Sequence, residues 1–225
     1  MAERLLAVRT QSTRPVTKNA NTTSTTFRGT DLPDMKIWLA SGSPRRAQIL
    51  RDAGFLFEVR APYVDESHHP NEFPSAYVQR LAREKVRTAA TAIRAEDPKH
   101  SGFVIGADTV VVSGAEILCK PETESRTCEM LRRLSGKAHE VHTGVAIVRI
   151  PDGAEKFFEE ITQVEFATLT DREIEEYAAS GDGNDKAGGY GIQGRAGRFV
   201  RRIDGCYFNV MGLPLARVYQ TLRDF

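Results

Sequence analysis

The sequence predicts a mixed α/β fold, and three of its features lead to this expectation. Beyond residue 36, segments rich in strand-forming residues alternate with segments whose apolar side chains recur at helical spacing. One helical pattern is long and covers residues 74–95. Two long strand patterns, over residues 138–150 and 154–169, are joined by the turn sequence Pro-Asp-Gly.

The other elements are predicted from local signals. Residues 36–40 alternate and are rich in strand formers, and Pro44 then opens a helix that ends at Gly54. Thr170 and Glu173 form a capping box that begins another helix. The remaining predicted elements are an extended segment over 55–64, a strand over 103–112, a return strand over 116–119, a helix over 122–134, strands around residue 204 and a helix from residue 214.

Composition limits the classes of protein to consider. A chain of 225 residues can form one large domain or two small lobes with a substantial core. Its net charge of +1 leaves no broad basic field, so we expect no nucleic-acid partner. No apolar run approaches the roughly 20 residues of a membrane span, so we expect no membrane partner. Cys119, Cys128 and Cys206 form no Cys-x-x-Cys pair, which predicts buried, reduced thiols in a cytoplasmic protein.

The first 35 residues differ from the rest of the chain. Residues 10–31 are rich in Thr, Ser and Asn and lack apolar periodicity, which predicts that residues 1–35 form a flexible N-terminal extension. Residues 1–9 have some features of an organelle presequence, but Glu3 and the short apolar stretch argue against one. We expect one folded domain over residues 36–225.

Two arginines fall where a helix least favours them. Arg45 and Arg46 lie in the first turn of the predicted helix, where each exposed cation opposes the helix dipole at a cost of about 0.3–1 kcal/mol. An anion would reverse that sign. Together with the hydroxyls of Ser41 and Ser43 and the free N–H groups, the arginines would form a phosphate site. The alternative is a solvated basic turn.

Two further charged residues interrupt apolar patterns. Lys85 lies on the apolar side of the 74–95 helix, from which it either extends to the edge or reaches into a polar cleft. Asp108 interrupts an apolar strand, where an unpaired carboxylate would cost several kcal/mol. A cation or a metal ion would remove that cost, and a hydrogen-bonded turn or bulge is the alternative.

Other candidate residues lie in predicted loops. Lys120 follows a strand, and Glu66 is either a metal ligand or solvated. Seven of the chain's 18 glycines fall within residues 181–197. This loop includes a G-x-G-x-x-G match, but it follows a helix and enters a strand, which excludes a dinucleotide fingerprint. The loop either brings its backbone close to a ligand, with Lys186 and Gln193 as polar groups, or is a flexible surface loop.

Taken together, these segments resemble the Maf family of nucleoside triphosphate pyrophosphatases from residue 36 to the C-terminus. The resemblance rests on ordered motifs, each weak alone and specific together. They are Leu39-Ala-Ser-Gly-Ser-Pro-Arg-Arg46, Leu81-Ala-Arg-Glu-Lys85, Gly106-Ala-Asp-Thr109, Lys120-Pro121, Leu134-Ser-Gly136, Lys186-Ala-Gly188, Ile192-Gln-Gly194 and Gly212-Leu-Pro214.

The resemblance implies a fold and a reaction. The implied Maf/ITPase-like α/β fold is an elongated mixed β-sheet flanked by helices, with two lobes and a central cleft, often as a homodimer. The implied reaction hydrolyses a nucleoside triphosphate to its monophosphate and pyrophosphate with a divalent metal, Mg²⁺ or Mn²⁺. The identities of Arg45, Thr109 and Gln193 resemble those of the branch that acts on dTTP and UTP.

The resemblance also implies roles for the candidate residues. Asp108 resembles the general base, which would deprotonate a metal-polarised water for attack on the α-phosphorus. The catalytic set would be Asp108, Lys85, Lys120 and Glu66, the metal ligands Asp108 and Glu66, and the substrate-binding set Ser41, Arg45, Arg46, Thr109, Gln193 and Lys186. An amide such as that of Gln193 can both donate to and accept from a pyrimidine edge.

Two rival hypotheses remain open at this point. One is a regulator of cell division that binds nucleotides without hydrolysing them. The other is the same hydrolysis on 7-methyl-GTP.

Overall fold

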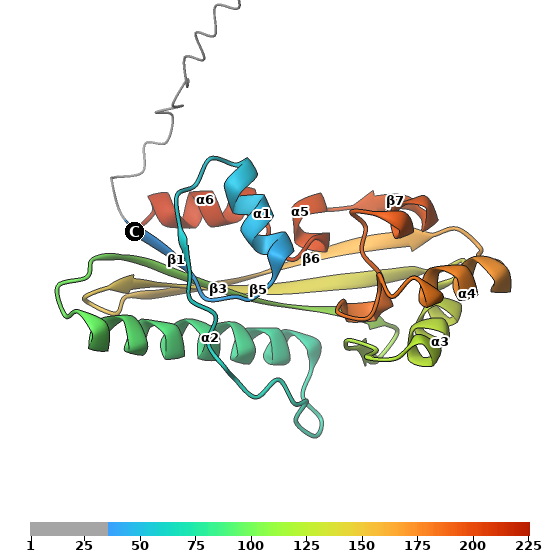
Figure 1. Cartoon of the computed structure of the whole chain (residues 1–225), viewed down its shortest axis with the longest axis horizontal. Coiled ribbons are helices and arrows are strands. Elements are labelled where there is room, and N and C mark those ends of the chain that lie inside the picture. Colours follow the sequence, from blue (N-terminus) through green and yellow to red (C-terminus); the bar gives the residue numbers. More distant parts are fainter. Residues whose placement is uncertain (1–35) are drawn as a thin grey trace, which may run out of the picture.

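The computed structural model describes residues 36–225, which form a seven-stranded sheet with helices on both faces (Figure 1). The strands lie in the order β2-β1-β3-β5-β6-β7, and β4 pairs with β3 outside this path. β1 runs parallel to β2 and β3, and the other pairings are antiparallel. The strands are β1 (Lys36–Leu39), β2 (Glu58–Val59), β3 (Gly102–Ser113), β4 (Glu116–Leu118), β5 (Ala138–Ile150), β6 (Glu155–Phe166) and β7 (Val200–Asp204).

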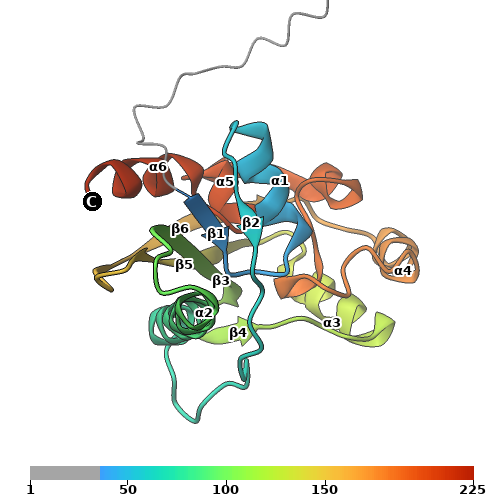
Figure 2. The ribbon, with the colours of Figure 1, turned by 60° about the vertical axis from the view of Figure 1, so that its left-hand side comes forward.

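The helices cover the sheet unequally. α2 runs along one face, α1 and α6 lie over the other, and α3 and α4 lie together at one end (Figures 1 and 2). The helices are α1 (Pro44–Asp52), α2 (Pro74–Glu96), α3 (Glu124–Leu134), α4 (Asp171–Ala179), α5 (Tyr207–Val210) and α6 (Leu215–Arg223), with short 3₁₀ turns at Ala187–Gly189 and Arg195–Phe199. The predicted elongated mixed sheet flanked by helices is confirmed. The predicted flexible extension, residues 1–35, lies outside the described residues.

Alternation along the strands gives the sheet two apolar faces. Trp38 and Val104 belong to the cluster that packs against α2, whereas Leu39 and Ile105 belong to the cluster that packs against α1 and α6. Successive side chains of a strand point to opposite faces of the sheet, so neighbouring residues pack against different helices. Each fully buried side chain of this kind contributes about 1.5–3 kcal/mol.

The face that carries α1 and α6 has two separate cores, which define two lobes. The first joins α1 and α6 to the sheet and includes Leu50 and Val218. The second joins α3, α4 and the glycine-rich loop, and includes Leu131, Tyr177 and Tyr190. The start of α4 is specified locally, by the capping box of Thr170 and Glu173. The predicted two-lobed arrangement is confirmed.

A break in strand pairing lies between the lobes. β1 pairs with residues 102–105 of β3, and β4 pairs with residues 111–113 on the same side. Among the described strands, none covers residues 106–110 of β3 on that edge. Because α1 begins directly after β1, its N-terminus points toward this gap, as expected where a parallel connection leaves a sheet.

Some predictions at the level of elements were wrong. β6 ends at Phe166 rather than Leu169, because a register shift occurs at residues 165 and 166 where β7 pairs with it. The predicted extended segment over 55–64 is not contradicted, since it contains the two-residue strand β2 and no helix. Cys128 is buried as expected, but Cys119 is exposed and Cys206 is half-buried, because both follow the ends of strands rather than lie within them.

Candidate active site

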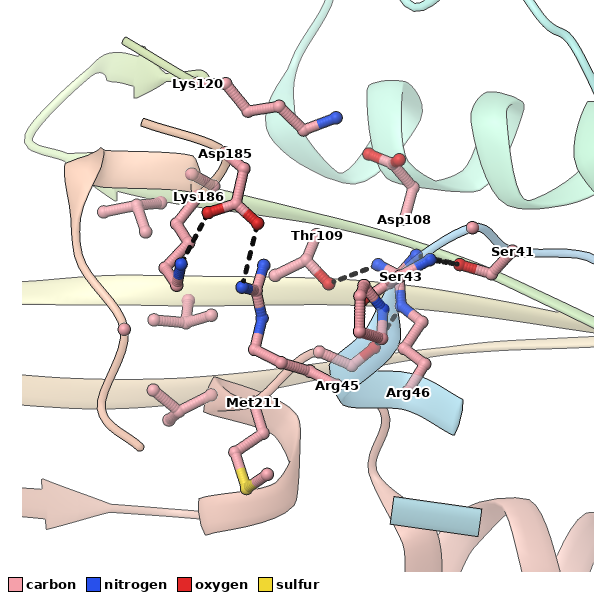
Figure 3. Close-up of a pocket in the computed structure, with 18 of the residues that line it drawn as sticks. Ser41, Ser43, Arg45, Arg46, Asp108, Thr109, Lys120, Asp185, Lys186 and Met211 are labelled. Carbon is pink, nitrogen blue, oxygen red and sulfur yellow. Dashed lines mark hydrogen bonds and ion pairs between the residues drawn. The ribbon is translucent and has the colours of Figure 1, made fainter. Parts of the chain in front are cut away.

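A cavity of about 360 Å³ lies at the gap in strand pairing, between the two lobes (Figure 3). All the site residues predicted from the sequence line it. They are Ser41, Arg45, Arg46, Glu66, Lys85, Asp108, Thr109, Lys120, Lys186 and Gln193. Five of them carry cationic side chains and two carry carboxylates, so the cavity suits a ligand with several negative charges.

The N-terminus of α1 forms one wall of the cavity. Ser43 occupies the N-cap position and Pro44 the first turn, as predicted, but the Ser43 side chain makes no capping hydrogen bond. The backbone N–H of Ser43 instead donates to Ser41 Oγ at 3.2 Å. The first backbone hydrogen bond of the helix is donated by Ala47. The N–H groups of Arg45 and Arg46 therefore remain available for an anion.

Arg46 is a buried cation, only 8% exposed. It donates to the carbonyl of Gly212 at 2.7 Å, to Ser41 Oγ at 3.0 Å and to Thr109 Oγ1 at 3.0 Å. Burial lowers its pKa, although the nearby charge of Asp108 acts in the opposite direction. No carboxylate within residues 36–225 forms an ion pair with Arg46. The guanidinium is thus fixed in place with two of its five N–H groups unused.

The catalytic candidates form a chain of charges on the opposite wall. Lys85 Nζ donates to Asp108 Oδ1 at 2.6 Å and also lies 2.6 Å from Glu66 Oε1. Lys120 Nζ donates to Glu66 Oε2 at 3.0 Å. Lys85 reaches into the polar cleft, and its charge offsets the cost of burying Asp108, which is 8% exposed. The cation that we expected beside Asp108 is therefore Lys85.

Glu66 bridges the two lysines from an exposed segment. Partial burial on its own would raise the pKa of this carboxyl group. Hydrogen bonds and opposite charge from Lys85 and Lys120 outweigh that effect and lower the pKa to about 2. Glu66 is therefore paired with two cations although its side chain is 40% exposed, and its role as a metal ligand stays a prediction.

The rim of the cavity holds a carboxylate that sequence reasoning missed. Asp185 accepts a hydrogen bond from Arg45 at 3.3 Å and from Lys186 at 2.5 Å, and so connects α1 to the glycine-rich loop (Figure 3). The only signal in the sequence was its position beside Lys186. This loop therefore contacts the site, and it is not merely a surface connection.

Thr109 and Gln193 occupy different environments within the cavity. The Thr109 hydroxyl accepts a hydrogen bond from Arg46 and shares another with Thr143 at 2.9 Å. The Gln193 side chain is exposed at the mouth. Thr109 therefore helps to fix Arg46, and contact of either residue with a nucleobase stays a prediction.

The second lobe supplies an apolar wall that the sequence did not mark. Val111, Val141, Tyr190 and Val210 line the cavity on this side. In the sequence these residues look like ordinary core residues. Periodicity predicts that a side chain is buried, but it does not show whether that side chain also borders a cavity. The cavity thus has one highly charged end and one apolar end.

Asp108 and Glu66, two carboxylates that line the cavity, are its candidate metal ligands. Among residues 36–225, no group of three or more His, Cys, Asp or Glu side chains could hold a metal ion. Asp108 and Glu66 nevertheless approach the same point, since both have an oxygen 2.6 Å from Lys85 Nζ. Mg²⁺ often binds through one or two carboxylates together with substrate phosphates. The donor set fits a metal that shares its ligands with a polyphosphate, not a site closed by protein alone.

Within residues 36–225, no helix is both long enough and apolar enough to cross a bilayer.

Comparison with known proteins assigns the chain to a family. The family described as Maf-like protein matches residues 36–225. Relatives from three bacteria are named dTTP/UTP pyrophosphatase. The one from Geobacillus sp. is 49% identical, and the match covers 82% of this chain and 95% of the relative. The one from Koribacter versatilis is 47% identical, with 84% of this chain and 94% of the relative covered, and the one from Carboxydothermus hydrogenoformans is 44% identical, with 85% and 99% covered. The solved structure of the Staphylococcus aureus Ham1 protein covers 84% of this chain and 98% of its own, but with a TM-score of 0.45 and 13% identity it adds nothing to the assignment. The chain belongs to the Maf family.

Proposed function

We propose that this protein is a nucleoside triphosphate pyrophosphatase that hydrolyses dTTP and UTP, together with modified pyrimidine nucleotides, to the monophosphate and pyrophosphate. The observation that carries the proposal is Arg46, a buried guanidinium beside a helix N-terminus with no carboxylate partner among the described residues. A buried cation in that position needs an anion, and a phosphate group supplies one. The relatives named dTTP/UTP pyrophosphatase support the choice of nucleotide.

The charged end of the cavity suits a triphosphate. Arg46 and the free N–H groups of α1 would hold one phosphate group, and Ser43, which makes no capping bond, would donate its hydroxyl. Lys120 and Lys186 extend the positive lining away from α1. Several phosphates can therefore be neutralised along one path.

Asp108 supplies the base for hydrolysis. Its carboxylate would take the proton from a water molecule whose oxygen attacks the α-phosphorus, so that the bond to the bridging oxygen of the β-phosphate breaks and pyrophosphate leaves. Lys85 holds Asp108 at 2.6 Å and fixes its direction. The arginines and lysines would stabilise the charge that develops on the leaving group.

A divalent ion, Mg²⁺ or Mn²⁺, would be held by Asp108 and Glu66 together with phosphate oxygens. When bound, it would neutralise phosphate charge and lower the pKa of a coordinated water. Lys85 contacts both carboxylates in this structure, so it would share them with the ion.

The apolar end of the cavity suits a nucleobase. Val111, Val141 and Tyr190 would contact the ring faces and any methyl substituent. Thr109 and Gln193 are the polar side chains that would meet its edge, and hydrogen-bonded recognition can discriminate strongly because a wrong base leaves polar groups unpaired.

We also propose that the protein acts in the cytoplasm as a homodimer. Its cysteines are free thiols, in keeping with a reducing compartment. Leu56, Tyr63 and Phe73 are large apolar side chains exposed by 78–95%, which favours a subunit contact. Sedimentation of the purified protein and imaging of a tagged copy in cells would test the two statements separately.

A panel of nucleotides tests the proposed reaction. The protein is incubated with dTTP, UTP, CTP, GTP and 7-methyl-GTP in the presence of Mg²⁺ or Mn²⁺, and released pyrophosphate is measured. We expect the fastest release from dTTP and UTP. Preferred turnover of 7-methyl-GTP would reassign the substrate, and binding without release would make the protein a nucleotide-binding regulator.

A further inference from the structure

Glu66 lies on a segment that has little support of its own. Residues 60–73, between β2 and α2, form no regular helix or strand (Figure 2). Most of their side chains are exposed. The Glu66 carboxylate nevertheless meets both Lys85 and Lys120. We propose that Tyr77 and Arg80, on the first half of α2, are positioning residues that hold Glu66 against these lysines. The inference rests on the proposed function, in which Glu66 takes part in the reaction.

Tyr77 anchors the backbone of Glu66. Its hydroxyl donates to the Glu66 carbonyl oxygen at 2.7 Å. The ring is only 5% exposed and packs in a cluster with Val78, Leu81 and Val110. A hydroxyl carried by a core side chain has few alternative positions, so it fixes the carbonyl that it binds.

The spacing along α2 connects this anchor to the catalytic lysine. Tyr77, Leu81 and Lys85 are four residues apart and therefore lie on one face of the helix. Tyr77 binds the main chain of Glu66, and Lys85 binds its carboxylate. Two points of one rigid element thus define where the residue lies and which way its side chain points.

Arg80 fixes the rest of the segment. It donates to Glu72 Oε1 at 2.7 Å and Oε2 at 2.8 Å, and to the carbonyl of Ser67 at 3.0 Å. Glu72 also accepts from the backbone N–H of His69 at 3.2 Å. The hydrogen bond from Arg80 lowers the pKa of Glu72 to about 2, so the pair stays charged over the physiological range. The fork of Arg80 therefore connects both ends of the 67–72 turn, which a lysine cannot do.

Neither residue lines the cavity, so each would act through Glu66 alone. Without the Tyr77 hydroxyl, the Glu66 carbonyl turns to water and the segment gains conformations in which the carboxylate is displaced. Displacement of a reacting group by about 1 Å can cost up to about 100-fold in rate. Since the substrate-binding arginines are untouched, the loss should fall on kcat and leave KM nearly unchanged.

A double-mutant cycle separates positioning from general support of the fold. Tyr77→Phe, Glu66→Gln and the double variant are assayed for pyrophosphate release from UTP, with Tyr219→Phe as the matched control, because no hydrogen bond of the Tyr219 hydroxyl occurs within the described residues. We expect Tyr77→Phe to lower kcat about 3- to 30-fold in the wild-type background and less than about 2-fold in the Glu66→Gln background. Arg80→Lys should behave in the same way, and Tyr219→Phe should match the wild type.

Two results would overturn the proposal. One is an unchanged kcat in both Tyr77→Phe and Arg80→Lys. The other is an equal fold-loss in the two backgrounds, which would mean that Tyr77 does not act through Glu66. Thermal unfolding of each variant shows whether a loss of stability accompanies the change in rate.

Hydrogen exchange supplies a readout that does not need turnover. The backbone amides of residues 63–72 should exchange faster in Tyr77→Phe and Arg80→Lys than in the wild type, and those of β3 should not change. Unchanged exchange in the segment would contradict the positioning role. If the wild type releases no pyrophosphate from any nucleotide, the proposed function fails, and the exchange data still decide whether Tyr77 and Arg80 hold the segment.

Discussion

The cavity has two halves that are built in different ways. Arg46, Lys85 and Asp108 are each at most 8% exposed and project from α1, α2 and β3, the elements that form the core. Glu66 and Lys120 lie in exposed connections instead, with side chains 40% and 53% exposed. The buried half has its geometry set by folding itself, whereas the rim depends on a few contacts between side chains. Substitutions in the buried half should therefore have the largest effects on activity, and substitutions at the rim should have smaller ones.

Asp108→Asn should have the largest effect. The amide keeps the shape of the side chain but cannot take a proton, so kcat for UTP should fall by about 10²–10⁴. Steady-state kinetics measure the change, and circular dichroism checks that the variant is folded. Turnover close to that of the wild type would exclude Asp108 as the base.

Arg46→Lys should come next. A lysine cannot make the three hydrogen bonds that hold the guanidinium to Gly212, Ser41 and Thr109. We expect kcat/KM for UTP to fall by about 10²-fold, the loss of one preorganised donor group in a buried site. Arg51→Lys, on the exposed side of the same helix, is the matched control and should retain full activity.

Asp185→Asn should have a smaller effect than Arg46→Lys, and it should raise the affinity for UTP rather than lower it. Asp185 neutralises Arg45 and Lys186 at the rim and so competes with a phosphate group for the same cations. Its removal should lower KM for UTP by about 2- to 5-fold at low salt, and the difference should shrink at high salt because exposed charges are screened. A raised KM would show that Asp185 assists binding.

The acid sensitivity of Glu66 should give the smallest effect. Its pKa of about 2 is below the ordinary value of 4.5, so its contribution to stability is present above pH 4.5 and is lost as the pH falls toward 2. Urea unfolding of the wild type and Glu66→Gln should therefore differ more at pH 6 than at pH 3. If the difference in unfolding free energy between the two proteins grows as the pH falls, Glu66 does not stabilise the fold by bridging Lys85 and Lys120.

The residues of the buried half could be predicted from the sequence, because a charged side chain in an apolar segment is costly to bury and therefore indicates a specific partner. Asp108 within an apolar strand and Lys85 on an apolar helix face each require a partner, and the structure shows that they are partners of each other. Arg46 was marked by its place in the first turn of a helix. The free-energy cost of placing each of these charged side chains in its position without a partner was enough to identify it as a candidate site residue.

The rim could not be predicted to the same degree. An exposed carboxylate such as Asp185 costs nothing in a loop, so no local pattern distinguishes it from solvated neighbours. The apolar wall was missed for the opposite reason, since Val141 and Tyr190 look like any core residue. The exposure of Cys119 followed from where β4 ends, and strand ends are the least certain part of a pattern.

The central claim is that a buried cation binds the polyphosphate and a separate buried carboxylate carries out the chemistry. Calorimetric titration with α,β-imido-UTP and Mg²⁺ tests it most directly, on the wild type, Asp108→Asn and Arg46→Lys side by side. We predict that Asp108→Asn binds the analogue within about 10-fold of the wild type while its turnover of UTP is lost, and that Arg46→Lys binds it at least about 10-fold more weakly than Asp108→Asn does. Binding by Arg46→Lys as tight as that of the wild type would contradict the account.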